Sequence, residues 1–209
     1  MASPLTTSGS GDPARLVRGA LFVDYVRIVK RQRAGSSEHL EPEDLAFLME
    51  SIDVTAWYPM ATFERFGLAI LEALPGTGTE AIRLFGRAQL GGLLSQFPTL
   101  LVPGYPRDSL MRLRVLMSSF FSFPALDVLS IDDTSAEVTI QYGMCADAER
   151  AASWQTLGFF EGLLSLSGAA HCHCEFLVRS WETPGRVTRL RLLWVDAPRA
   201  RSHVSGAAQ

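Results

Sequence analysis

Residues 168–181 read GAAHCHCEFLVRSW, and the alternation within this stretch decides how the second half of the chain folds. Side chains of an extended strand point by turns to its two faces. One face of a strand over 170–181 carries Cys172, Cys174, Phe176 and Val178. The other face carries His171, His173, Glu175 and Arg179. The first set is typical of a core face, where cysteine acts as a small hydrophobe, and the second is typical of a solvated face.

The same alternation argues against a metal centre, although histidine and cysteine are common metal ligands. Zinc needs about four converging nitrogen or sulfur ligands, and alternation divides the candidates between two faces. The Cys-x-x-Cys spacing of structural zinc sites is absent, and Cys145 is expected to be an inert thiol. The sequence therefore predicts no metal and no cofactor. If a metal were bound, its ligands would be His171, His173 and Glu175.

The neighbouring segments extend the sheet. Residues 186–196 alternate in the same way, and 126–142 form a hairpin around the turn at Asp132–Ser135. A helix over about 147–166 separates the hairpin from the last two strands. Residues before about 121 have helical spacing, with glycines inside a predicted helix near 79–94 that indicate a close approach, kink or break. The fold class is α+β, with an N-terminal helical layer followed by β-β-α-β-β forming an antiparallel sheet.

Length and composition set the domain organisation. The 209 residues suit one well-buried domain, expected over 14–197. Residues 1–13 are rich in Ser, Thr and Gly and are expected to be a disordered N-terminus, with a flexible tail over 198–209.

Charge and hydropathy exclude several partners. The net charge is −3 with both signs interspersed, so no basic face for nucleic acid is expected. There is no signal peptide and no run of 18 apolar residues, so no membrane segment is expected. Three cysteines do not make a disulfide framework, which favours a cytoplasmic location.

Glu161 is the most notable acid in the sequence. It lies on a helix where Trp154, Gly158 and Gly162 follow one another at i, i+4 and i+8, a stripe that lets a neighbouring element come close. Glu161 is either a buried acid with a raised pKa or a marker of the wet edge of the helix. The second interpretation is favoured because glutamate is rarely fully buried.

A basic pair lies on another predicted helix. Arg83 and Arg87 are one helical turn apart and could grip an anionic ligand, although a solvated face is the simpler interpretation.

Large apolar side chains are abundant in the helical half and could line a pocket between layers, with Glu161 as a polar group. The candidates are Trp57, Phe63, Phe66, Phe85, Met117, Phe120, Phe121 and Trp154. The alternative is that these side chains simply fill the core.

The segment SWQTLGFFEGLLSLSGAAHCHCEF over 153–176 resembles the C-terminal part of the 4-vinyl-reductase domain. The matching residues are Trp154, Gly158, Phe159, Gly162, Gly168 and Glu175. Domains of that family resemble the heme-NO-binding fold and serve as small-molecule sensors, for example in activators that sense phenols. The wider pattern, including VRGALFVD (17–24) and EAIRLFGRAQLGGLL (80–94), is similar to an uncharacterised paralogous family described from myxobacteria, which implies a bacterial protein.

This sequence also departs from the pattern of the 4-vinyl-reductase family at its ligand positions. Phenol-sensing members bind zinc through cysteines and a glutamate; Glu175 matches the glutamate, but Ser153 and Val178 stand where cysteines would be. The heme-binding version needs a proximal histidine and a Tyr-x-Ser-x-Arg motif, which the YPRDS segment at 105–109 does not match. The comparison therefore implies neither zinc nor heme.

These observations favour a binding or sensory module for a small, largely apolar molecule, acting through a protein partner or as a homodimer. Two alternatives stay open. One is a tailoring or isomerising enzyme for an apolar metabolite, with Glu161 or Glu175 as acid or base. The other is a ligand-free adaptor for protein–protein contact.

Overall fold

The computed structural model describes residues 14–32, 37–73, 78–183 and 185–197. The segments 1–13 and 198–209, predicted to be disordered and flexible, lie outside the described residues. Within the described part, no helix is both long and apolar enough to span a bilayer.

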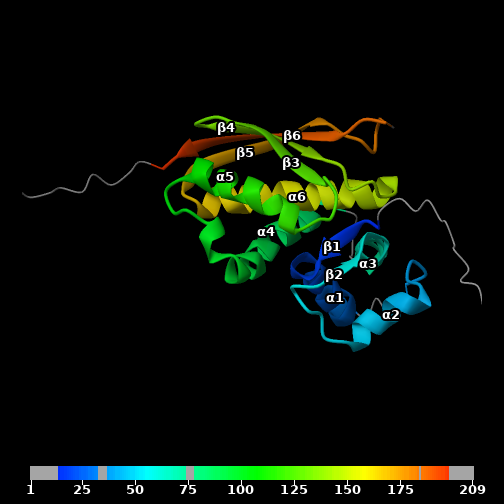
Figure 1. Cartoon of the computed structure of the whole chain (residues 1–209). Coiled ribbons are helices and arrows are strands. Elements are labelled where there is room, and N and C mark those ends of the chain that lie inside the picture. The colour runs from blue at the N-terminus through cyan, green and yellow to red at the C-terminus, as the bar shows by residue number, and fades with distance from the viewer. Residues whose placement is uncertain (1–13, 33–36, 74–77, 184, 198–209) are drawn as a thin grey trace, which may run out of the picture.

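A four-stranded antiparallel sheet forms one side of the molecule (Figure 1). Its strands lie in the order β3 (Leu126–Ile131), β4 (Ser135–Ile140), β6 (Thr188–Asp196) and β5 (Ala169–Val178). Val138 pairs with Leu190, and Ala136 pairs with Leu192; all four are buried, so the two central strands present one apolar face. The predicted β-β-α-β-β order and the α+β class are confirmed.

The alternation of side chains between two faces that was predicted for β5 is confirmed over the central part of the strand. His171 and His173 are exposed, whereas Cys172 and Cys174 are half-buried against the core. The thiols are not fully buried because β5 is an edge strand.

The prediction fails at the end of β5. A bulge after Phe176 places Val178 opposite the outward-facing Arg189, and not on the thiol face. Arg179, predicted to lie on the solvated face, is exposed, and its guanidinium is 5.8 Å from the centroid of the Phe176 ring.

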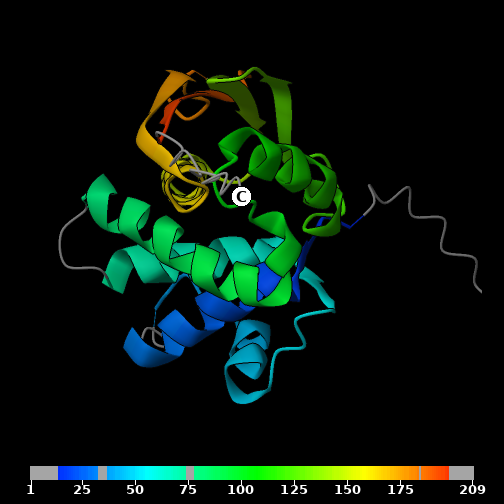
Figure 2. The ribbon, with the colours of Figure 1, turned by 90° about the vertical axis from the view of Figure 1, so that its left-hand side faces the viewer.

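Helix α6 (Ala146–Leu166) runs beneath the sheet, and Figure 2 shows it end-on between the sheet and the other helices. Leu157, Phe160, Leu163 and Leu164 have almost no exposed surface. The helix is followed by Gly168, whose φ of +98° lies in the left-handed region that glycine adopts most easily.

The helical half comprises α1 (Gly19–Gln32), α2 (Pro42–Met49), α3 (Met60–Ala73), α4 (Thr79–Gln96) and α5 (Pro106–Leu116), with 3-10 turns at Pro98–Leu100 and Met117–Ser119. Helices α1 to α3 lie on the opposite side of α4 and α6 from the sheet (Figures 1 and 2).

Sequence analysis missed one feature of this half: β1 (Leu16–Arg18) pairs with β2 (Trp57–Pro59). Three residues are too few to show a strand period, so a largely helical reading of this region overlooked them.

Helices α4 and α6 cross at two glycines. A Cβ on Gly86 would lie 1.9 Å from the Gln155 carbonyl oxygen, and one on Gly158 would lie 2.0 Å from the Arg83 carbonyl oxygen. The close approach expected from the glycines of both helices is therefore confirmed at this pair. At Gly91, by contrast, a Cβ would meet nothing within 4 Å.

Helix α2 is attached to α3 by a buried ion pair. The Asp44 carboxylate is fully buried and accepts bonds from Arg65 Nε at 2.6 Å and Arg65 Nη2 at 2.8 Å, as well as from the Glu41 N–H at 2.9 Å. Desolvation opposes ionisation of Asp44, but the bonds from Arg65, the Glu41 N–H and Thr62 outweigh it and hold the pKa below its ordinary value of 3.8.

We expect this pair to make stability pH-dependent. Because the pKa of Asp44 is lowered on folding, its contribution is complete above about pH 4 and is lost as pH falls through the folded-state pKa. Asp44→Asn should lower the free energy of unfolding by about 2 kcal/mol at pH 7. Urea unfolding of both proteins between pH 7 and pH 3 should show this difference shrinking at the acid end. A difference that stays constant over that range would contradict the assignment.

Candidate ligand site

Two adjoining cavities lie among α1, α3, α4 and α6. The larger has a volume of about 210 Å³ and the smaller about 80 Å³. Tyr25, Phe63, Ala152 and Gln155 line both, so these side chains form the partition between them. The larger cavity is otherwise lined mainly by apolar side chains from these helices, and the smaller extends toward the segment after α5. Both hollows therefore suit an apolar occupant.

The partition contains a chain of three polar side chains. The Tyr25 hydroxyl donates to Gln155 Oε1, and Gln155 Nε2 donates to Gln89 Oε1. These residues come from α1, α6 and α4, so the chain ties three helices together at the point where the cavities meet. Burial raises the pKa of Tyr25 well above its ordinary value, so its hydroxyl stays protonated.

The smaller cavity has a polar pair of its own. The hydroxyl oxygens of Tyr142 and Thr156 are 2.6 Å apart, and burial likewise raises the pKa of Tyr142. The tyrosine, threonine and glutamine groups of the two cavities are therefore neutral hydrogen-bonding groups.

Several predicted pocket residues do line these cavities. Phe85 lines the larger, while Met117, Phe120 and Phe121 line the smaller, and Phe63 lines both.

Three others lie elsewhere. Trp57 stacks under the Arg18 guanidinium, 4.0 Å from the ring centroid. Phe66 is fully buried in the core beside Phe22. Trp154 packs against Phe176, with ring centroids 4.8 Å apart.

Sequence analysis missed the polar partition. The partner of the Tyr25 hydroxyl lies 130 residues away on another helix, so the sequence around Tyr25 alone could not identify it. Gln155 lies between Ala152 and Phe159 at i+3 and i+4 spacing, along the face of α6 that lines the cavities. A glutamine on such a face was the available signal.

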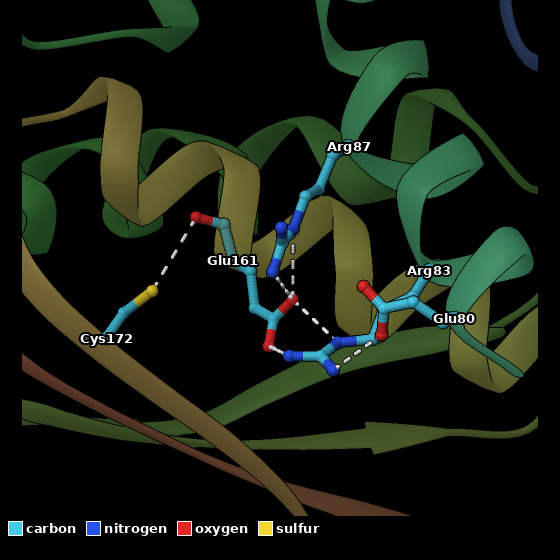
Figure 3. Close-up of polar contacts among 5 residues, drawn as sticks. All are labelled: Glu80, Arg83, Arg87, Glu161 and Cys172. Carbon is cyan, nitrogen blue, oxygen red and sulfur yellow. Dashed lines mark hydrogen bonds and ion pairs between the residues drawn. The ribbon is translucent and has the colours of Figure 1, made fainter.

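Glu161 is buried, so the wet-edge interpretation was wrong. Its side chain is 4% exposed. Arg83 Nε donates to it at 2.9 Å and Arg87 Nη2 at 2.7 Å, and a second bond from Arg83 Nη2 completes a bidentate contact (Figure 3). Arg83 and Arg87 therefore hold a carboxylate of their own chain.

Neither candidate acid lines the two cavities described here. Glu161 is engaged by two guanidinium groups. Glu175 lies on the outward face of the sheet, 3.6 Å from Arg191 Nη1 and 3.7 Å from His173 Nε2.

No group of three or more His, Cys, Asp or Glu side chains within the described ranges is arranged to hold a metal ion. His171, His173 and Glu175, the ligands named for the case of a bound metal, do not form such a group.

No family model and no curated protein sequence matches this chain. Solved structures do match it. An oxygen-binding H-NOX domain related to soluble guanylate cyclases superposes with a TM-score of 0.55 at 13% identity, over 88% of this chain and 100% of that chain. The chain has the H-NOX fold. The unliganded Fe(II) H-NOX protein from K. algicida gives a TM-score of 0.57 at 10% identity, over 88% of this chain and 100% of that chain. An H-NOX structure concerned with the mechanism of activation gives 0.57 at 14% identity, over 88% and 99%.

The H-NOX fold raises the question of heme, which proteins hold through His, Cys, Met or Tyr. The described histidines, His39, His171 and His173, are exposed, and no histidine or cysteine lines either cavity.

The remaining ligand types are poorly placed for iron. The hydroxyls of Tyr25 and Tyr142 are hydrogen-bonded and kept protonated, which leaves the thioethers of Met117 and Met144 without a nitrogen or thiolate ligand to complement them. No arginine or lysine of the described ranges lines the cavities to pair with the propionates of heme. The residues present in these two cavities do not fit heme.

Proposed function

We propose that this chain is a binding or sensory module that takes a small, largely apolar molecule into the paired cavities without heme. The observation that carries the proposal is the larger cavity, whose described wall residues are apolar except for the Tyr25–Gln155 pair, Gln32 and Glu64. An apolar protein cavity of about 150 Å³ is large enough for benzene, whereas drug-sized ligands need about 300–1,000 Å³. A volume of about 210 Å³ therefore suits a molecule slightly larger than benzene.

The fold supports a sensory role. One solved relative of the same fold is an oxygen-binding domain related to soluble guanylate cyclases, so the architecture is compatible with detection of a small molecule. We further propose that the module signals through a protein partner or as a homodimer. We also propose that it belongs to the 4-vinyl-reductase or the myxobacterial family.

Binding is favoured over catalysis because neither Glu161 nor Glu175, the two acids predicted for catalysis, lines the cavities. Glu161, the stronger candidate for acid–base chemistry, is neutralised by Arg83 and Arg87 outside the cavities. We therefore assign the cavities to ligand binding.

The test is to fill the cavities. Ala152 is buried and lines both of them, so Ala152→Leu places three additional carbons in the ligand space. Calorimetric titration with 4-phenyl-1-butanol should show saturable binding to the native chain and none to the variant, while thermal stability stays equal or rises because a void is filled.

Two further variants sharpen this test. Ala88→Leu changes an exposed residue of α4 that lines neither cavity and should bind normally. Ala148→Leu intrudes on the larger cavity alone. Unchanged affinity in both Ala152→Leu and Ala148→Leu would contradict the proposal. Native mass spectrometry of protein purified without denaturant should detect any molecule that co-purifies.

A further inference from the structure

A third hollow adjoins the larger cavity. This groove has a volume of about 380 Å³, and Leu71, Ile82 and Ala151 line both it and the larger cavity. These three apolar side chains lie where the two spaces meet. The rest of the groove differs from the cavity, because it includes charged groups and the Trp154 indole.

The charges around the two spaces are unbalanced. Glu64 lines the larger cavity, and Glu72, Asp147 and Arg150 line the groove together with His39. Arg150 Nη2 is 3.7 Å from Asp147 Oδ1, so that pair cancels. Counted over the described residues alone, the combined lining is therefore negative whether or not His39 carries a proton.

Two carboxylates remain without a basic partner in the described part of the chain. Glu64 Oε1 accepts the Cys145 N–H at 2.8 Å, and Glu72 Oε2 accepts the Ser37 hydroxyl at 2.5 Å. Both partners are neutral donors, so neither carboxylate is engaged by a cationic side chain of the described residues. Glu64 is half-buried, which makes that charge less screened than one in open water.

We propose that the ligand is an amphiphile whose apolar tail fills the larger cavity and whose amine head, positively charged at neutral pH, lies where the cavity meets the groove, attracted by Glu64 of the cavity and Glu72 of the groove. The groove supplies the Trp154 ring, and aromatic faces attract cations. A carboxylate or phosphate head of the same length would meet a negative field. This inference rests on the proposed function, because it assumes that the larger cavity takes the tail.

Three probes with one tail and different heads test this inference on the full chain: 4-phenylbutylamine, 4-phenyl-1-butanol and 4-phenylbutanoate. By calorimetry at pH 7, the amine should bind roughly tenfold more tightly than the alcohol, and the carboxylate roughly tenfold more weakly. Glu64→Gln combined with Glu72→Gln should remove the preference for the amine, so that the ratio of the Kd of the alcohol to that of the amine falls to about one. Glutamine can still accept the bonds from Cys145 and Ser37, so the local structure is retained.

The control is Glu182→Gln, which removes a carboxylate in the segment after β5 that lines neither space. It should keep the full preference for the amine. Equal affinities for the three probes, tighter binding of the carboxylate, or an amine preference that survives the double variant would each overturn the head-group inference while the cavity function stands. Failure of all three probes to bind would instead overturn the proposed function itself.

Discussion

Gly158→Ala is expected to lower the free energy of unfolding by about 3 kcal/mol, because the added methyl group has no space at the crossing of α4 and α6. Its Cβ would lie 2.0 Å from the carbonyl oxygen of Arg83, a backbone atom that cannot rotate away. The two helices must therefore separate, and the buried side chains around the crossing lose contact. Urea unfolding followed by circular dichroism measures the change.

The matched control is Gly91→Ala on α4 itself. A Cβ there meets nothing within 4 Å, and alanine is favoured over glycine inside a helix by about 1 kcal/mol. That variant should be as stable as the native chain or more so, whereas Gly86→Ala should behave like Gly158→Ala. Equal stability of Gly158→Ala and Gly91→Ala would show that the helices are not in such close contact.

Glu161→Ala is expected to lower the free energy of unfolding by about 2 kcal/mol. The change removes every bond that Arg83 and Arg87 make to this carboxylate and leaves two like charges one turn apart on α4. We do not expect the full cost of breaking a buried pair, since Arg83 and Arg87 are 30% and 42% exposed and can turn toward water. Glu161→Gln keeps the shape of the side chain, so its free energy of unfolding should lie between those of the native chain and Glu161→Ala.

Glu80→Ala serves as the comparison for this prediction. Glu80 also pairs with Arg83, at 3.1 Å, but its side chain is 62% exposed. An exposed pair of this kind contributes at most about 1 kcal/mol to the free energy of unfolding. If chemical unfolding shows that Glu161→Ala destabilises the chain no more than Glu80→Ala does, then Glu161 is not bound by Arg83 and Arg87 as described.

The fold was largely accessible from the sequence, and the reasons are local. The alternation of thiols and imidazoles along 171–174 depends only on strand geometry, so it predicted the orientation of β5 correctly. The glycines at 86 and 158 each indicated a point where another element comes close to the helix that carries them. The bulge after Phe176 was not accessible, because it depends on how β5 pairs with β6.

The site was less accessible, because its features join elements far apart in the chain. Glu161 is buried at little cost because Arg83 and Arg87 of another helix meet it, and a general expectation about glutamate cannot include those partners. The bond from Tyr25 to Gln155 spans 130 residues. The list of large apolar residues identified several wall residues, but it could not separate cavity walls such as Phe85 from filled core such as Phe66.

The crossing at Gly86 and Gly158 also restricts where motion can occur. Backbone carbonyl groups occupy the positions that side chains at Gly86 and Gly158 would take, so α4 and α6 are in direct contact there. The two helices should therefore move as one rigid unit. A conformational change that accompanies binding should then fall on the opposite wall of the larger cavity, which is formed by α1 and α3. The side of the molecule that faces away from the sheet is therefore the part that can rearrange around a bound molecule (Figure 1).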